Sequence, residues 1–211
     1  DLHSFPTRRS SDLHIVSNFG RQVVEELNRH RMVVDLSHGG PRLISQAIAA
    51  SRLPPVISHS GCRALVDLPR NVRDEEMRAL ADRGGVIGIY FMPFLSNRPP
   101  ATAADVFRHI EHAVNICGED HVGIGTDGAV TPLELDDAAR RANRAEFEDR
   151  KRANIAAPGE TPDGEYVVPD YNQPSRMWRL AEDLSRRGWP VSRIEKLFGG
   201  NFLRVFGEVW G

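Results

Sequence analysis

The sequence has no apolar run long enough to cross a membrane and no excess of charge of either sign. Its longest apolar segments, such as residues 86–90, are far shorter than the roughly 20 residues that a bilayer-spanning helix needs. The 27 Lys and Arg residues are balanced by 29 Asp and Glu residues, for a net charge of −2 at pH 7. We therefore expect no transmembrane segment, no basic surface for acidic membranes and no nucleic-acid partner.

Cysteine is scarce as well. Cys62 and Cys117 form neither a CxxC pair nor a dense disulfide framework, which excludes a small disulfide-stabilised scaffold and assigns no compartment. We interpret both as small buried residues. With 40% hydrophobic and 27% charged residues, the 211-residue chain has the composition of an ordinary globular protein.

Residues 1–13 differ from the rest of the chain. They show neither apolar periodicity nor the order of regions found in a signal peptide. The stretch resembles the one-frame translation of a short-read sequencing adapter. We expect a non-native tail over residues 1–13 and one partial domain over residues 14–211, with a natural polar tail as the alternative.

Helical and strand-like segments alternate from Ser17, which can cap the first helix. Short β-branched runs at 32–36, 56–59, 86–90 and 122–126 suit buried strands, and helical patterns at 41–48, 74–82 and 102–117 lie between them. This order predicts parallel βαβ units and an α/β fold. A helix is expected within 133–155, an exposed loop over 158–169, and helices at 175–187, 192–197 and 201–209.

Three side chains stand where such a fold places its chemistry, at the carboxyl ends of strands. His38 and His59 end the first two predicted strands, and Asp127 follows the fourth. Neutral imidazole is a common zinc ligand, and a hydrolytic zinc site gathers several ligands while leaving one position for water. From these residues alone, hydrogen-bonded structural histidines and a turn-forming or capping aspartate remain alternatives.

Five short motifs follow one another along the chain. They are FGRQVVEELNR at 19–29, VDLSH at 34–38, VISHS at 56–60, PRN at 69–71 and GNFLRVF at 200–206. In their order and spacing they resemble the membrane (renal) dipeptidase family of zinc peptidases, from about residue 17 to residue 211. The resemblance implies the C-terminal half of a (β/α)₈ TIM-type barrel, strands five to eight, with extra C-terminal helices. Amidohydrolase barrels carry His, His and Asp on strands five, six and eight.

The resemblance also implies a role for each residue. His38 and His59 match two histidines that bind one zinc of a binuclear Zn²⁺ centre. Arg70 matches an arginine that contacts the substrate, where pairing with a carboxylate suits its geometry; without the resemblance it is interpreted as a solvated surface residue. Asp127 matches the aspartate that acts as acid and base for the metal-bound water and the leaving amine. The family continues with a second Asp and Gly, whereas this chain continues with residues 128–130, Gly-Ala-Val, which leaves the substrate preference open.

A His-x-Asp pair and a bridging glutamate complete the two metal sites of the family, and no residue of this chain is assigned to them. We therefore expect the parent to be a zinc-dependent dipeptidase that hydrolyses the peptide bond of dipeptides, with a homodimer as a candidate assembly, and this chain to be an N-terminally truncated fragment that is inactive alone. The alternatives are another amidohydrolase-type metal-dependent amide or lactone hydrolase, and a non-catalytic fragment that self-associates through exposed sheet edges.

The other histidines and the tryptophans are expected to be structural. His109 and His112, three residues apart, share one face of a helix that we expect to be solvated or half-buried. His121 precedes the last strand, at the end opposite the site. Burial of apolar area is the expected role of Trp178, Trp189 and Trp210.

Overall fold

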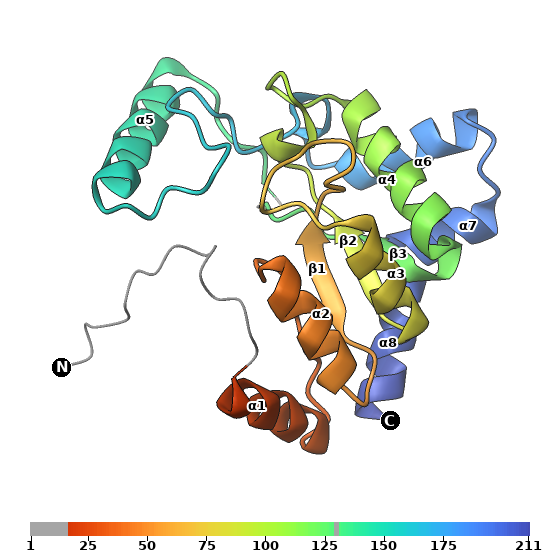
Figure 1. Cartoon of the computed structure of the whole chain (residues 1–211). Helices are drawn as coiled ribbons and strands as arrows, with labels where there is room; N and C mark the ends of the chain where they lie inside the picture. Colours follow the sequence, from red (N-terminus) through yellow and green to blue (C-terminus); the bar gives the residue numbers. More distant parts are fainter. Residues whose placement is uncertain (1–16, 129–130) are drawn as a thin grey trace.

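The centre of the protein is a three-stranded parallel sheet in the order β1-β2-β3 (Figure 1). The structure is a computed structural model that describes residues 17–128 and 131–211, so the tail expected over residues 1–13 lies outside the described residues. Its strands are β1 (Val56–Ser60), β2 (Val86–Ile89) and β3 (Val122–Ile124). Parallel pairing with a helix between consecutive strands confirms the predicted α/β class.

Three helices lie side by side along one face of this sheet (Figure 1). They are α2 (Pro41–Ala50), α3 (Asp74–Asp82) and α4 (Ala103–Cys117), all within one or two residues of the predicted bounds. Local hydrogen bonds fix the first residue of α4. In α4 the Thr102 hydroxyl accepts a hydrogen bond from the Asp105 backbone N–H, and the Asp105 carboxylate accepts one from the Thr102 N–H at 2.8 Å. This reciprocal cap satisfies two donors that a helix start leaves free.

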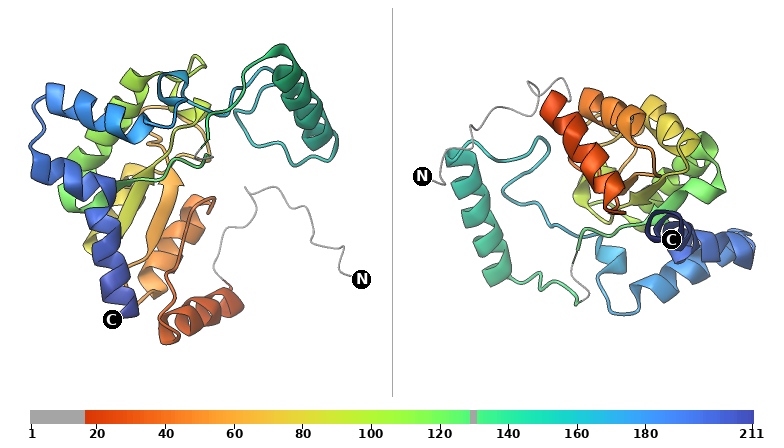
Figure 2. Two further views of the ribbon diagram at one scale, coloured as in Figure 1. Left: turned by 180° about the vertical axis from the view of Figure 1, so that it is seen from behind. Right: turned by 90° about the horizontal axis from the view of Figure 1, so that it is seen from below.

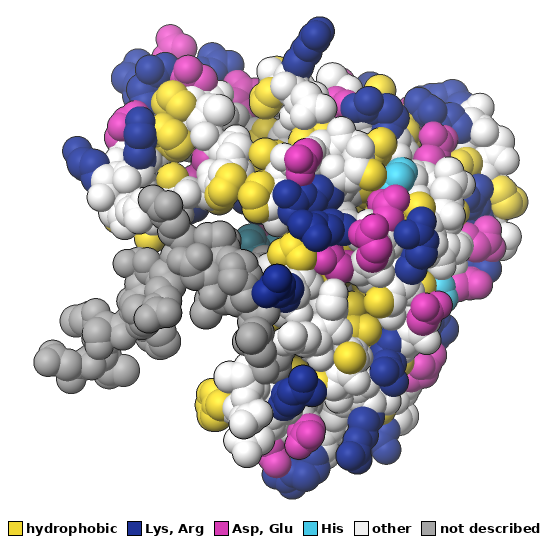
Figure 3. Space-filling model, viewed as in Figure 1, with side chains coloured by type: hydrophobic (Ala, Val, Ile, Leu, Met, Phe, Trp, Pro, Cys, Tyr) yellow, Lys and Arg dark blue, Asp and Glu magenta, His cyan; other side chains and the backbone are white. Residues whose placement is uncertain are grey.

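The remaining helices surround this core, and α5 lies to one side of the sheet in every view (Figures 1 and 2). No helix among the described residues is long and apolar enough to cross a membrane. On the face shown in Figure 3, basic and acidic side chains are mixed. The helices are α1 (Asn18–Arg29), α5 (Asp137–Arg152), α6 (Arg176–Arg186), α7 (Val191–Glu195) and α8 (Asn201–Trp210), with the short turns η1 (Pro93–Leu95), η2 (Glu119–His121), η3 (Pro169–Tyr171) and η4 (Lys196–Gly200).

Residues 32–36, predicted to be a full strand, form only a single parallel bridge between Asp35 and Val56. The Leu36 N–H donates to the Val56 carbonyl at 2.8 Å, and the Val56 N–H donates to the Val34 carbonyl at 2.9 Å. The segment pairs on one side only, at the edge of the described sheet, and His38 ends the extended run with a φ of 61°. These two backbone bonds and the hydrogen bonds between Asp35 and Ser58 hold the segment against β1.

The carboxyl ends of the strands curve toward one another. A Cβ atom added to Gly88 would lie 2.1 Å from the Ser58 carbonyl oxygen, and one added to Gly125 would lie 1.8 Å from the same atom. Ser58 belongs to β1 and Gly125 follows β3, although β2 lies between these two strands. Such an approach requires a strongly curved sheet, and only glycine permits it because any side chain would overlap the carbonyl.

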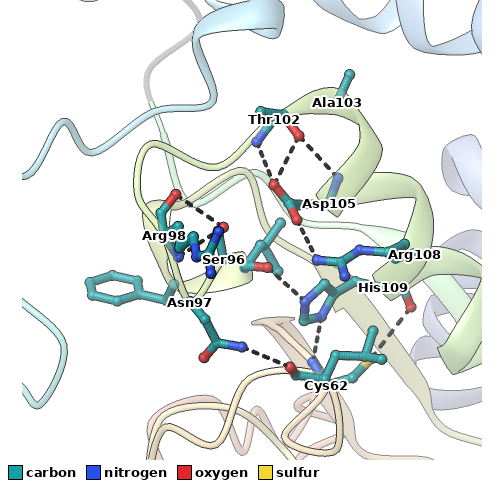
Figure 4. Close-up of polar contacts among 12 residues, drawn as sticks. Cys62, Ser96, Asn97, Arg98, Thr102, Ala103, Asp105, Arg108 and His109 are labelled. Atoms are coloured by element: carbon teal, nitrogen blue, oxygen red, sulfur yellow. Dashed lines mark hydrogen bonds and ion pairs between the residues drawn. The ribbon is translucent and has the colours of Figure 1, made fainter.

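Burial corrects two expectations from the sequence. His109 is fully buried rather than solvated or half-buried. Its ring lies between two backbone segments: Nδ1 accepts a hydrogen bond from the Cys62 N–H at 2.8 Å, so Nε2 carries the proton and donates to the Leu95 carbonyl at 3.1 Å (Figure 4). Trp189 is buried as expected, but Trp178 and Trp210 are 77% and 62% exposed.

Candidate active site

Four sequence-predicted residues, His38, His59, Arg70 and Asp127, meet at the carboxyl end of the sheet. His38 follows the bridged segment, and His59 lies near the end of β1. Arg70 lies in the loop between β1 and α3, and Asp127 follows β3. Parallel strands carry their carboxyl ends to one edge, so residues far apart in the sequence share a single site.

The two imidazole rings face each other. The His38 Nε2 and His59 Nε2 atoms lie 2.8 Å apart, and the ring planes are inclined by 64°. The separation is that of a hydrogen bond, in which one nitrogen carries the proton. Burial, followed by the nearby His59 and Arg70, lowers the pKa of His38, which favours the neutral ring that a metal ligand requires.

Asp127 lies between the histidine pair and Arg70. Its Oδ1 atom is 3.8 Å from His59 Nε2, and its Oδ2 atom is 3.8 Å from a terminal nitrogen of Arg70. Both distances are too long for hydrogen bonds. At 3.8 Å the Arg70 guanidinium and the Asp127 carboxylate still attract each other. Asp127 has a φ of 55°, so it shares with His38 a left-handed conformation that non-glycine residues seldom adopt. Such conformations cluster at functional sites because the surrounding structure must hold them.

Arg70 is enclosed by aromatic rings rather than solvated. Its guanidinium carbon lies 3.9 Å from the centre of the Phe94 ring and 5.8 Å from that of Tyr90, and its side chain is 14% exposed. Its buried Nε has no hydrogen-bond partner among the described residues. Attraction between the cation and the ring faces holds the guanidinium in place, and its planar set of donors suits an anion such as a carboxylate.

Asn71 anchors the loop that carries Arg70. The buried Asn71 amide donates to the carbonyls of Val66 (2.9 Å) and Phe94 (3.1 Å), and its side-chain oxygen accepts a hydrogen bond from the Tyr90 hydroxyl. One side chain thus ties the loop after β1 to the segment after β2. The third residue of the Pro-Arg-Asn motif therefore supports the second.

Two residues without a predicted role, Asp35 and Ser58, support His59 from behind. The Ser58 hydroxyl is 2.9 Å from His59 Nδ1 and 2.6 Å from Asp35 Oδ2. Burial raises the pKa of Asp35, but hydrogen bonds from Ser58 and Ser37 outweigh it and hold this pKa below its usual range. The sequence held one signal of this role for Asp35: a carboxylate within an apolar, β-branched segment, where burial of an unpaired charge would be costly.

The chemistry of the two imidazoles fits zinc. Two nitrogen ligands of a tetrahedral zinc ion lie about 3.3 Å apart, so small ring rotations would let both Nε2 atoms reach one ion. No group of three or more His, Cys, Asp or Glu side chains suited to a metal occurs in the described part of the chain. Two imidazole nitrogens alone do not complete the four-coordinate shell that zinc prefers.

Similarity to known proteins extends over most of the chain. Residues 3–147 match the family model of the membrane dipeptidases, peptidase family M19. Dipeptidase 3 of Rattus norvegicus is 30% identical over 98% of this chain and 35% of its own length. Dipeptidase tcpJ of Claviceps purpurea is 32% identical over 93% of this chain and 39% of its own length. A solved amidohydrolase from Pseudomonas aeruginosa has a TM-score of 0.77 at 33% identity, covering 92% of this chain and 57% of that one.

The chain spans less than half the length of the two curated relatives named above. The family model nevertheless matches well over half of the chain itself, and the matched segment contains His38, His59, Arg70 and Asp127. The chain belongs to the membrane dipeptidase family, peptidase family M19.

Proposed function

We propose that this chain supplies two zinc ligands, a substrate-binding arginine and a proton-transferring carboxylate to a zinc-dependent dipeptidase. The observation that carries the proposal is the convergence of His38, His59, Arg70 and Asp127 at one end of the sheet, with the two Nε2 atoms 2.8 Å apart. A relative named as a dipeptidase matches 98% of the chain, which supports dipeptides as the substrate class.

The scaffold proposed for this site is the C-terminal half, strands five to eight, of a (β/α)₈ barrel. Three features support it: the parallel strand order, the helices along one face of the sheet, and the curvature that brings Ser58 and Gly125 together. In this scheme the bridged segment at Asp35 is strand five of the barrel, and β1 to β3 are strands six to eight. Active sites of such barrels lie at the carboxyl ends of the strands.

His38 and His59 would hold one zinc ion of a binuclear centre. When bound, zinc supplies a Lewis acid and lowers the pKa of a coordinated water into the neutral range. The neutral state of His38, favoured by burial, keeps its nitrogen available as a ligand at neutral pH. The other ligands of the centre come from outside the described residues.

Asp127 and Arg70 divide the remaining work. The Asp127 carboxylate lies 3.8 Å from the histidine pair, within reach of a proton released there, and can return that proton to the leaving amine nitrogen. Arg70, fixed against Phe94 and short of partners, is placed to pair with the carboxylate of a dipeptide. Arg70 also lies 3.8 Å from Asp127, so the proposed substrate-binding and proton-transferring groups are neighbours in one site.

Zinc content tests the ligand assignment directly. His38→Ala and His59→Ala, each made in the full-length parent enzyme, are compared with the unmodified enzyme after zinc loading and buffer exchange, by elemental analysis. His112→Ala is the matched control, because its ring contacts Asp74 at 2.8 Å, away from the site. We expect zinc to be lost from both site variants and kept by the control. Equal zinc content in all four proteins would contradict the assignment.

Activity is tested in the full-length parent enzyme. A dipeptide panel is assayed beside N-acyl amino acids and lactones, which distinguishes a dipeptidase from another amidohydrolase-type enzyme. We expect Asp127→Asn to lower kcat by about 10²- to 10⁴-fold, the usual contribution of a positioned acid–base group. Arg70→Lys should raise KM for dipeptides because it removes the planar, forked donor. Turnover of lactones without turnover of dipeptides would favour the alternative enzyme class.

A further inference from the structure

We propose that Asp35 and Ser58 are positioning residues that fix the tautomer of His59, with the proton on Nδ1 and the lone pair on Nε2. The proposal concerns a metal-free property of the ring, and it rests on the proposed function only where it names zinc as the ion that Nε2 then receives. Neither residue touches the reacting atoms, so their effect is exerted through His59.

Asp35 is surrounded by donors from two segments. Its Oδ1 atom accepts from the Ser37 N–H at 3.0 Å, the Ser37 hydroxyl at 2.8 Å and the Ser58 N–H at 3.1 Å. Its Oδ2 atom accepts from the Ser58 hydroxyl at 2.6 Å. An ionised carboxylate has no hydrogen to donate, so each of these four contacts requires its partner to be the donor.

The count of hydrogens then decides the state of His59. A serine hydroxyl has one hydrogen, and the Ser58 oxygen lies near three acceptors: Asp35 at 2.6 Å, His59 Nδ1 at 2.9 Å and the Ser37 hydroxyl at 3.0 Å. The bond to the carboxylate is the shortest and is charge-assisted, so it takes the hydrogen. The 2.9 Å contact with His59 is then a hydrogen bond only if His59 Nδ1 carries a proton and donates it to Ser58.

A neutral imidazole carries one proton, so protonation of Nδ1 leaves Nε2 with its lone pair. That lone pair faces His38 Nε2, which in the metal-free protein must donate across the 2.8 Å contact. The His38 ring makes no other hydrogen bond among the described residues. The two histidines therefore differ: the surroundings of His59 hold it in the tautomer that ligates through Nε2, whereas His38 must change tautomer, losing the proton at Nε2 to solvent and taking one up at Nδ1, before Nε2 can bind a metal.

Ser58→Ala isolates this effect from folding. The backbone N–H of residue 58 still donates to Asp35 Oδ1, so the tie between the bridged segment and β1 remains. Only the hydroxyl between Asp35 and His59 is removed. Ser45→Ala is the matched control, because the Ser45 hydroxyl donates to the Pro41 carbonyl at an exposed position of α2.

The test is nitrogen–proton correlation NMR of the ¹⁵N-histidine-labelled, metal-free chain at about pH 8, where free imidazole is neutral. We expect His59 to be the Nδ1–H tautomer in the unmodified chain and in Ser45→Ala. In Ser58→Ala we expect a mixture of tautomers or the Nε2–H form. In the full-length parent enzyme, zinc affinity measured by competition with a chelating dye should fall tenfold or more in Ser58→Ala, as for other residues that orient a metal-binding histidine.

Two results would overturn the inference: an Nε2–H tautomer of His59 in the unmodified metal-free chain, or an unchanged Nδ1–H tautomer in Ser58→Ala. Both are read without zinc, so a failure of the proposed function is distinguishable. If His59 shows the expected tautomer and responds to Ser58→Ala while His59→Ala in the full-length parent enzyme keeps all of its zinc, the positioning role stands and the ligand assignment fails.

Discussion

Protonation of buried His109 should make the stability of the protein fall steeply in mild acid. The ring is fully buried, accepts from the Cys62 N–H and donates to the Leu95 carbonyl, so both nitrogens are used by the neutral form (Figure 4). Burial, as the largest cause, lowers the pKa of His109 from 6.5 to about 4. A protonated ring would need an acceptor at Nδ1, where the protein presents a donor.

The direction and size follow from proton linkage. Between about pH 6.5 and pH 4 the unfolded chain binds a proton at His109 and the folded chain does not, so acid favours unfolding. The contribution of the depressed pKa is complete above pH 6.5 and is lost as the pH falls to about 4. A shift of about 2.5 units corresponds to roughly 3 kcal/mol at 1.36 kcal/mol per unit. That is a large part of the 5–15 kcal/mol typical of a folded domain.

Urea unfolding followed by circular dichroism at several pH values between about 7.5 and about 4 measures this loss of the free energy of unfolding. His109→Gln keeps a side chain with one acceptor and one donor but removes the titration. We expect the unmodified protein to lose about 3 kcal/mol more than His109→Gln over this range. His112→Gln, three residues along α4, should keep the steep profile. Parallel profiles for the unmodified protein and His109→Gln would refute the reasoning.

Three further predictions concern stability at neutral pH, each measured as a shift of the urea midpoint at constant slope. Gly125→Ala should lower the free energy of unfolding by at least about 3 kcal/mol, because its Cβ would lie 1.8 Å from the Ser58 carbonyl oxygen. Gly128→Ala should be tolerated, because the nearest atom to its Cβ would be 3.8 Å away. Equal midpoints for the two variants would argue against the curved sheet. Asn71→Ala should cost about 2–4 kcal/mol because the Tyr90 hydroxyl and two carbonyls lose a buried partner; a neutral effect would mean that the Arg70 loop is held otherwise. Trp189→Ala should cost about 3–5 kcal/mol, and exposed Trp178→Ala within about 0.5 kcal/mol; similar losses in both would contradict their difference in burial.

The positions of the helices along the chain could be predicted from the sequence because they depend on residues only a few positions apart. The spacing of apolar residues predicted α3 with the bounds that the structure has, and the Ser17 cap was predicted from its residue type. The positions of His38, His59 and Asp127 after successive strands indicated one shared edge, because parallel strands all point the same way. Topology thus predicted that these residues share one edge, whereas the distances between their side chains came from the structure.

Contacts that depend on curvature and packing were decided only by the tertiary structure. The hydroxyl of Ser58 reaches both Asp35 and His59 because the bridged segment lies against β1, and the single bridge itself reflects the edge position of that segment. The stacking of Arg70 on Phe94 and the burial of His109 likewise join segments distant in the sequence. Such contacts depend on how far a sheet curves and which helix face turns inward, and these are set by the sum of many weak packing energies across the core. Local residue preferences determine where helices and strands form, whereas the partners of a buried polar group are brought together only when those elements pack.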